Sequence, residues 1–215
     1  VKEEEKAEQL FFSFDNLPSD QERYQEESVY GGFNFDGARR WKASFYDSAT
    51  NTTAAHPLEV NTTDGTMKLS STNWSNSGNA LLVETYAGGN TPLKYDPQHA
   101  QVLQIRLKMS NMKAVSSADP FLRLWYYKSD GSSFVKTYDK AHYMGSSFVS
   151  DGQYTTITMD LYSQEEIDAN ASVAGFPTST FSKAGNIGGI CLGFHNFTAK
   201  EADIPADVLI DYIYI

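Results

Sequence analysis

The stretch QVLQIRLKMS (101–110) alternates apolar and polar residues along most of its length. Apolar side chains recur at every second position from Leu103 to Met109, and polar side chains occupy the positions between them. Successive side chains of a β-strand point to opposite faces of the sheet. The pattern therefore predicts a strand with one face in a hydrophobic core and the other in solvent.

Similar segments follow one another from end to end of the chain. They are rich in aromatic and β-branched residues, which fit a pleated, half-buried surface. They span 10–16, 66–72, 79–86, 121–128, 132–138, 154–161, 188–197 and 207–215. Asp-Gly pairs at 64–65, 130–131 and 151–152 suit tight turns between them. We expect the closing strand of this series to pair near the opening one.

One short helix is expected near 163–170, where Ser163 and Glu166 have the spacing of a capping box. Many short strands with almost no helix cannot supply the crossovers that a parallel sheet needs. The sequence therefore predicts an all-β protein, a two-sheet antiparallel β-sandwich. Sandwiches of about 200 residues form one domain, so we expect a single domain over 10–215 after a linker stub at 1–9.

The charge of the chain limits its partners. Lys plus Arg total 17 against 27 Asp plus Glu, a formal net charge of -10. Such a surface repels phosphate groups, so neither nucleic acid nor an anionic membrane is expected as a partner. No apolar run approaches the roughly 20 residues needed to span a bilayer. The single cysteine, Cys191, lies in an apolar segment, where a buried and inert thiol is expected.

Motifs that carry catalysis are missing from the sequence. There is no Glu-x-Asp-x-x-Glu run of a sandwich glucanase, no Gly-x-Ser-x-Gly elbow and no His-Glu-x-x-His pair. We therefore predict that the chain is not an enzyme. A glycosidase built from carboxylates on distant strands stays open as an alternative, because a sequence does not show which strands meet.

The order of the segments resembles the jelly-roll carbohydrate-binding modules attached to bacterial polysaccharide-degrading enzymes. The resemblance rests on LFFSFDN (10–16), QVLQIRLKMS (101–110), LRLWYYKSDG (122–131), GQYTTITMDL (152–161), GGICLGF (188–194) and VLIDYIYI (208–215). ERYQEESVYGGFNFDGARRW (22–41) is similar to a segment in modules of gut and rumen clostridial surface proteins.

This resemblance implies a jelly roll that binds polysaccharide without chemistry. It implies a secreted or cell-surface location, other modules in the same protein, and recruitment of a bacterial cell or enzyme complex to a plant-derived glucan. The clostridial likeness favours a starch-like α-glucan. The alternative is a structural or adhesin-like module that binds protein or spaces its neighbours, since one fold hosts many functions.

A sugar site needs an exposed aromatic ring beside polar side chains, because a pyranose has apolar faces and hydroxyl edges. If the leucines of FLRLWYYK (121–128) face the core, Arg123, Trp125 and Tyr127 must face outward. They are our candidates for carbohydrate binding. The alternative for Trp125 is a structural position, at the edge of the second sheet or under a loop.

Three further residues are candidates for the same site. Gln104 and Arg106 face outward on the strand at 101–110, and they join Trp125 if the two strands are neighbours in one sheet. Trp74 lies in the turn-rich segment STNWSNSGN (71–79), which offers little core to join. We therefore expect Trp74 to be exposed and able to bind a ligand.

The resemblance also implies a structural calcium ion between the first and last strands. It places Asp211 at the position that often supplies one carboxylate, with Asp15 or Asp36 as candidates for another. Calcium takes about six to eight oxygen ligands, so these residues are a partial set.

Overall fold

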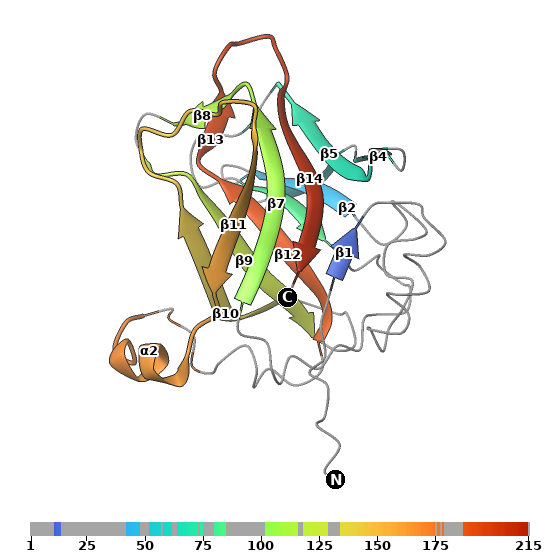
Figure 1. The fold of residues 1–215 in the computed structure, drawn as a ribbon. Helices are drawn as coiled ribbons and strands as arrows, with labels where there is room; N and C mark the ends of the chain where they lie inside the picture. The colour runs from blue at the N-terminus through green and yellow to red at the C-terminus, as the bar shows by residue number, and fades with distance from the viewer. Residues whose placement is uncertain are drawn as a thin grey trace.

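The computed structural model describes residues 11–13, 42–47, 52–56, 58–61, 64–72, 74, 80–84, 102–115, 118–128, 134–174, 176, 178 and 187–214. These residues form two large antiparallel sheets that face each other, with a short helix beside them (Figure 1). The predicted two-sheet antiparallel β-sandwich is confirmed. No helix among the described residues has both the length and the apolar character needed to cross a membrane.

The first sheet, sheet A, has the strand order β11-β7-β14-β5-β4, and β1 also pairs with β14. Its strands are β11 (Tyr154–Asp160), β7 (Val102–Ser110), β14 (Ala206–Tyr214), β5 (Thr66–Ser71), β4 (Glu59–Asn61) and β1 (Phe11–Ser13). In the pairing of β1 with β14, Phe11 lies opposite Tyr214. The predicted meeting of the opening and closing strands is thus confirmed.

The second sheet, sheet B, has the order β10-β9-β12-β6-β2-β3. Its strands are β10 (Phe134–Tyr143), β9 (Phe121–Lys128), β12 (Ile187–His195), β6 (Ala80–Glu84), β2 (Lys42–Asp47) and β3 (Thr52–His56). A separate two-stranded sheet joins β13 (Phe197–Ala199) to β8 (Met112–Ala114). Sheets A and B therefore each combine strands from early and late parts of the chain.

The core lies between the two sheets. Strand β7 shows the predicted alternation, because Leu103, Ile105 and Leu107 are fully buried while the residues between them are half-buried. Leu124 of β9 and Leu192 of β12 face them from sheet B and are also fully buried. Burial of this apolar surface is the main stabilising contribution to the fold.

A β-bulge interrupts the alternation in β14. The register against β7 shifts between Ile210 and Tyr212, which inserts one extra residue into β14. Ile210 and Ile213 are both fully buried, whereas Asp211 and Tyr212 are both half-buried. The bulge therefore presents two consecutive side chains on the outward face of sheet A.

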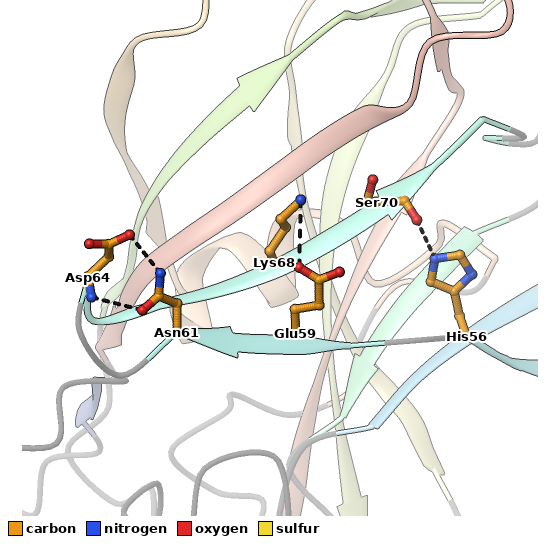
Figure 2. A network of polar contacts seen from close by, with 6 residues as sticks. All are labelled: His56, Glu59, Asn61, Asp64, Lys68 and Ser70. Atoms are coloured by element: carbon orange, nitrogen blue, oxygen red, sulfur yellow. Dashed lines mark hydrogen bonds and ion pairs between the residues drawn. The ribbon is translucent and has the colours of Figure 1, made fainter.

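The two sheets are also joined where the chain passes from β3 to β4 (Figure 2). Nε2 of His56 in sheet B donates to the carbonyl oxygen of Ser70 in sheet A, at 2.7 Å. On the sheet A side, Lys68 forms an ion pair of 3.6 Å with Glu59 on the neighbouring strand. The His56 hydrogen bond fixes this edge of the sandwich, whereas the exposed ion pair contributes little.

Helix α2 (Gln164–Ala169) begins where the sequence predicts. The Ser163 hydroxyl accepts a hydrogen bond from the Glu166 amide at 3.2 Å, and the Glu166 carboxylate accepts one from the Ser163 amide at 2.8 Å. This reciprocal capping box satisfies backbone donors that a helix start leaves unpaired. Ile167 is buried and anchors the helix to the protein.

Replacing Ser163 with alanine is expected to lower the free energy of unfolding by about 1 kcal/mol, since the cap is lost. Chemical denaturation measures the change. Ser172→Ala is the matched control, because Ser172 is exposed beyond the helix and its loss should change stability by less than about 0.5 kcal/mol. Equal effects of the two substitutions would mean that the cap contributes nothing.

Candidate functional site

The outward face of sheet B carries a group of aromatic and cationic side chains. Strand β9 sets this face: Leu122 and Leu124 are fully buried in the core, which turns Arg123 and Trp125 outward. Both outward side chains are half-buried. The structure thus places Arg123 and Trp125 as the alternation predicts.

The neighbouring strands add rings beside Phe121 of β9. Phe121 lies opposite Tyr143 of β10 and opposite His195 of β12. The Phe121 and His195 rings are 3° from parallel, with centroids 4.6 Å apart. This separation is close to the spacing between strands, so the two rings stand upright side by side. Tyr143 leans against Phe121 at 42° and is 63% exposed.

Trp125 is oriented differently from this upright pair. Its indole plane makes an angle of 66° with the His195 ring, at a centroid distance of 5.5 Å. Its outer atoms Cζ3 and Cη2 reach over Gly193 of the neighbouring strand β12. The guanidinium carbon of Arg123 lies 5.1 Å from the indole centroid. Trp125 is therefore the ring that lies across the sheet, with the Arg123 cation close to it.

Strand β12 contributes small or buried residues to this group. Cys191 lies opposite Trp125 and is fully buried, which confirms the prediction of a buried thiol. His195 is also buried, at 7% exposure. We name the group Phe121, Arg123, Trp125, Tyr143, Gly193 and His195 the sheet B face.

Arg106 and Gln104 do not join the sheet B face, which corrects the arrangement expected from the sequence. Both residues lie on β7 in sheet A, whereas Trp125 lies on β9 in sheet B. Outward residues of the two sheets point in opposite directions, away from the shared core. The prediction required β7 and β9 to be neighbours, and a periodic pattern within a strand carries no information about its neighbours.

On sheet A, Arg106 belongs to a different group. Its guanidinium donates to the Asp211 carboxylate, which the bulge of β14 presents. The guanidinium carbon also lies 4.2 Å from the centroid of the Tyr154 ring, and Nζ of Lys108 lies 5.1 Å from it. Burial and the nearby Asp211 charge raise the pKa of the Tyr154 hydroxyl, and the Arg106 charge opposes them. The net effect of these surroundings is a raised pKa, which favours the neutral form of the Tyr154 side chain.

Trp74 is buried, so the prediction that it is exposed was wrong. Only 4% of its surface is accessible, and its indole nitrogen donates to the Ala206 carbonyl oxygen at 2.9 Å. Its ring meets Phe194 of sheet B edge to face, with centroids 6.3 Å apart. The prediction used the polar residues next to Trp74 in the sequence. The contacts that bury Trp74 come instead from distant residues on the two sheets.

Asp211 is the described residue that the resemblance assigns to a calcium site. Its carboxylate is paired with Arg106, a cation that competes with a metal ion for the same oxygens. Asp15 and Asp36 lie outside the described residues, within which no cluster of three or more metal-ligating side chains occurs.

The calcium prediction is checked by chelation. A lower unfolding temperature in EDTA would support it, and an unchanged temperature would remove it.

Several residues of the sheet B face were absent from the sequence-based candidates. Phe121, Tyr143 and His195 come together only through the register of three strands. Gly193 left a signal, because a glycine inside a strand marks a place where another group approaches closely. Tyr127 continues β9 opposite Gly189, but its side chain lies outside the described residues.

No protein-family model matches the chain, and no curated protein matches its sequence. Among solved structures, the chain is similar to the "xylan-binding module CBM15", with 13% identity over 82% of this chain and 90% of that one, and a TM-score of 0.35. It is also similar to the family 11 carbohydrate-binding module from Clostridium thermocellum in complex with a β-1,3-1,4-mixed-linked tetrasaccharide. That match has 13% identity over 84% of this chain and 91% of that one, and a TM-score of 0.31.

Proposed function

We propose that this chain is a non-catalytic polysaccharide-binding module whose ligand lies on the sheet B face. The observation that supports the proposal is the half-buried Trp125, which lies across the sheet with Arg123 beside it. An indole held in this way offers an apolar plane for the C–H face of a pyranose ring. The guanidinium has donors for the hydroxyl groups at the sugar's edge.

The surrounding contacts favour a site that is ordered before the ligand arrives. Trp125 is held between β9 and β12 by its contacts with His195 and with the backbone at Gly193. His195 is itself stacked on Phe121. A ring that already occupies its bound orientation loses little conformational entropy on binding, which raises affinity. Tyr143, which is exposed, contacts the other side of Phe121 and extends this series of rings toward solvent.

We extend the proposal to a plant-derived glucan, and to a secreted or cell-surface module that recruits a bacterial cell or its enzymes to that polymer. The support is the sequence resemblance described above, whose clostridial segment favours a starch-like α-glucan. Affinity should be modest, since hydroxyl groups exchange water for protein at small net gain.

Affinity electrophoresis tests the proposed function. The purified domain is run in gels that contain starch, mixed-linkage β-glucan, xyloglucan, xylan or no polysaccharide, beside a protein that binds none of them. We expect selective retardation in one gel, which would also name the polymer. Unchanged migration in every gel would reject polysaccharide binding and favour the protein-binding or spacer alternative.

A further inference from the structure

The outward positions of β12 are occupied by unusually small side chains beside Trp125. Cys191 lies opposite Trp125 in the register, and Gly193 is the next outward residue along β12. Leu192, the one residue between them, faces the core and is fully buried. The indole of Trp125 therefore extends from its own cross-strand pair toward the next pair, which contains Gly193 and Arg123.

Gly193 is needed at this position for space. A Cβ atom added there would lie 2.8 Å from Cζ3 and 3.1 Å from Cη2 of Trp125, and 2.8 Å from Nε2 of His195. Carbon atoms in contact lie about 3.5–4.0 Å apart, so the two rings already occupy the volume of a methyl group. The backbone at Gly193 is ordinary strand, unlike that of Gly65 and Gly152, which have positive φ.

We infer that Gly193 is the positioning residue of the sheet B face: its missing Cβ lets the Trp125 indole lie across β12. The effect of Gly193 on ligand binding rests on the proposed function. Its effect on the position of the Trp125 ring does not, because the distances around Gly193 involve no ligand. With a side chain at position 193, the indole would have to swing away from the sheet. The plane offered to a sugar and its distance from Arg123 would both change.

Alanine at position 193 should displace Trp125 and leave the fold intact. The three atoms nearest to a new Cβ belong to the outer parts of two side-chain rings. Both rings must give way to a new Cβ: the His195 ring, buried against Phe121, has room for a small shift only, whereas Trp125 is half-buried and can move further, toward solvent. Alanine also loses less backbone entropy on folding than glycine does, which offsets part of the strain.

The position of the indole is measured without any ligand. The domain is labelled with 5-fluorotryptophan, and the resonances of its three tryptophans are assigned with Trp125→Phe and Trp74→Phe. In Gly193→Ala we expect the Trp125 resonance to shift, while that of the core residue Trp74 stays in place. An unmoved Trp125 resonance would overturn the inference.

A double-mutant cycle on affinity then tests the consequence for binding. Gly193→Ala alone should weaken polysaccharide binding about tenfold, which corresponds to about 1.4 kcal/mol, since the stacking ring is displaced. In the Trp125→Phe background the same substitution should change affinity less than about twofold, because phenylalanine lacks the outer ring that reaches over position 193. Equal losses in both backgrounds would overturn the inference, since Gly193 would then make room for the ligand itself.

The two readouts separate the inference from the proposed function. If the unsubstituted domain binds no polysaccharide, the proposed function fails, and the fluorine spectrum still decides whether Gly193 positions Trp125. If the domain binds and the cycle shows no coupling, the function stands and the positioning role is wrong.

Discussion

Replacing Trp74 with alanine is expected to lower the free energy of unfolding by about 3–5 kcal/mol, the usual cost of removing a large buried aromatic side chain. The ring is 4% exposed and packs edge to face on Phe194 of sheet B. Its nitrogen binds the Ala206 carbonyl oxygen of sheet A at 2.9 Å. One side chain thus connects both sheets, and its loss leaves a cavity between them and a carbonyl without its donor.

Chemical denaturation followed by far-UV circular dichroism measures this change. Trp74→Phe separates the contribution of packing from that of the hydrogen bond, because phenylalanine keeps most of the packing and cannot donate to Ala206. We expect Trp74→Phe to cost clearly less than Trp74→Ala. A loss below about 1 kcal/mol for Trp74→Ala would contradict a core position for this residue.

Replacing Trp125 with alanine is expected to weaken polysaccharide binding by about tenfold or more, because the stacking plane disappears and tenfold corresponds to about 1.4 kcal/mol. Stability should change much less than in Trp74→Ala, since Trp125 is half-buried on an outward face. Retardation in the gel of the preferred polymer measures binding, and thermal unfolding of the same sample measures stability.

Tyr154→Ala is the matched control for Trp125→Ala. Tyr154 is also an outward aromatic residue with cations on its ring, but it lies on the opposite side of the sandwich in sheet A. We expect its replacement to leave binding unchanged. Loss of binding in Tyr154→Ala with retention in Trp125→Ala would move the site to sheet A.

Patterns within one segment predicted the local structure well. The period of two in β7 identified a strand and its buried side, because burial of every second residue requires that spacing. The spacing of Ser163 and Glu166 identified the start of α2, since a capping box is formed by residues three positions apart. Both features depend only on residues that are close in the sequence.

Arrangements between segments were less predictable. Arg106 and Trp125 both face outward as their strands predict, yet the order of the strands places them in different sheets. Trp74 follows β5 in a polar segment, and contacts with Ala206 and Phe194 bury it. Each of these contacts joins residues more than 100 positions apart. The sequence around one partner therefore gives no indication of which residue it will contact.

The place of β14 has a consequence for how the protein is made. This strand lies inside sheet A, between β7 on one side and β5 and β1 on the other, although it is the latest of the described strands in the sequence. While the chain emerges from the ribosome, β5 and β7 have no strand between them until residues 206–214 arrive. Exposed strand edges and uncovered apolar side chains recruit other chains. Sheet A is therefore completed in a late step, and the nascent chain is open to self-association until that step.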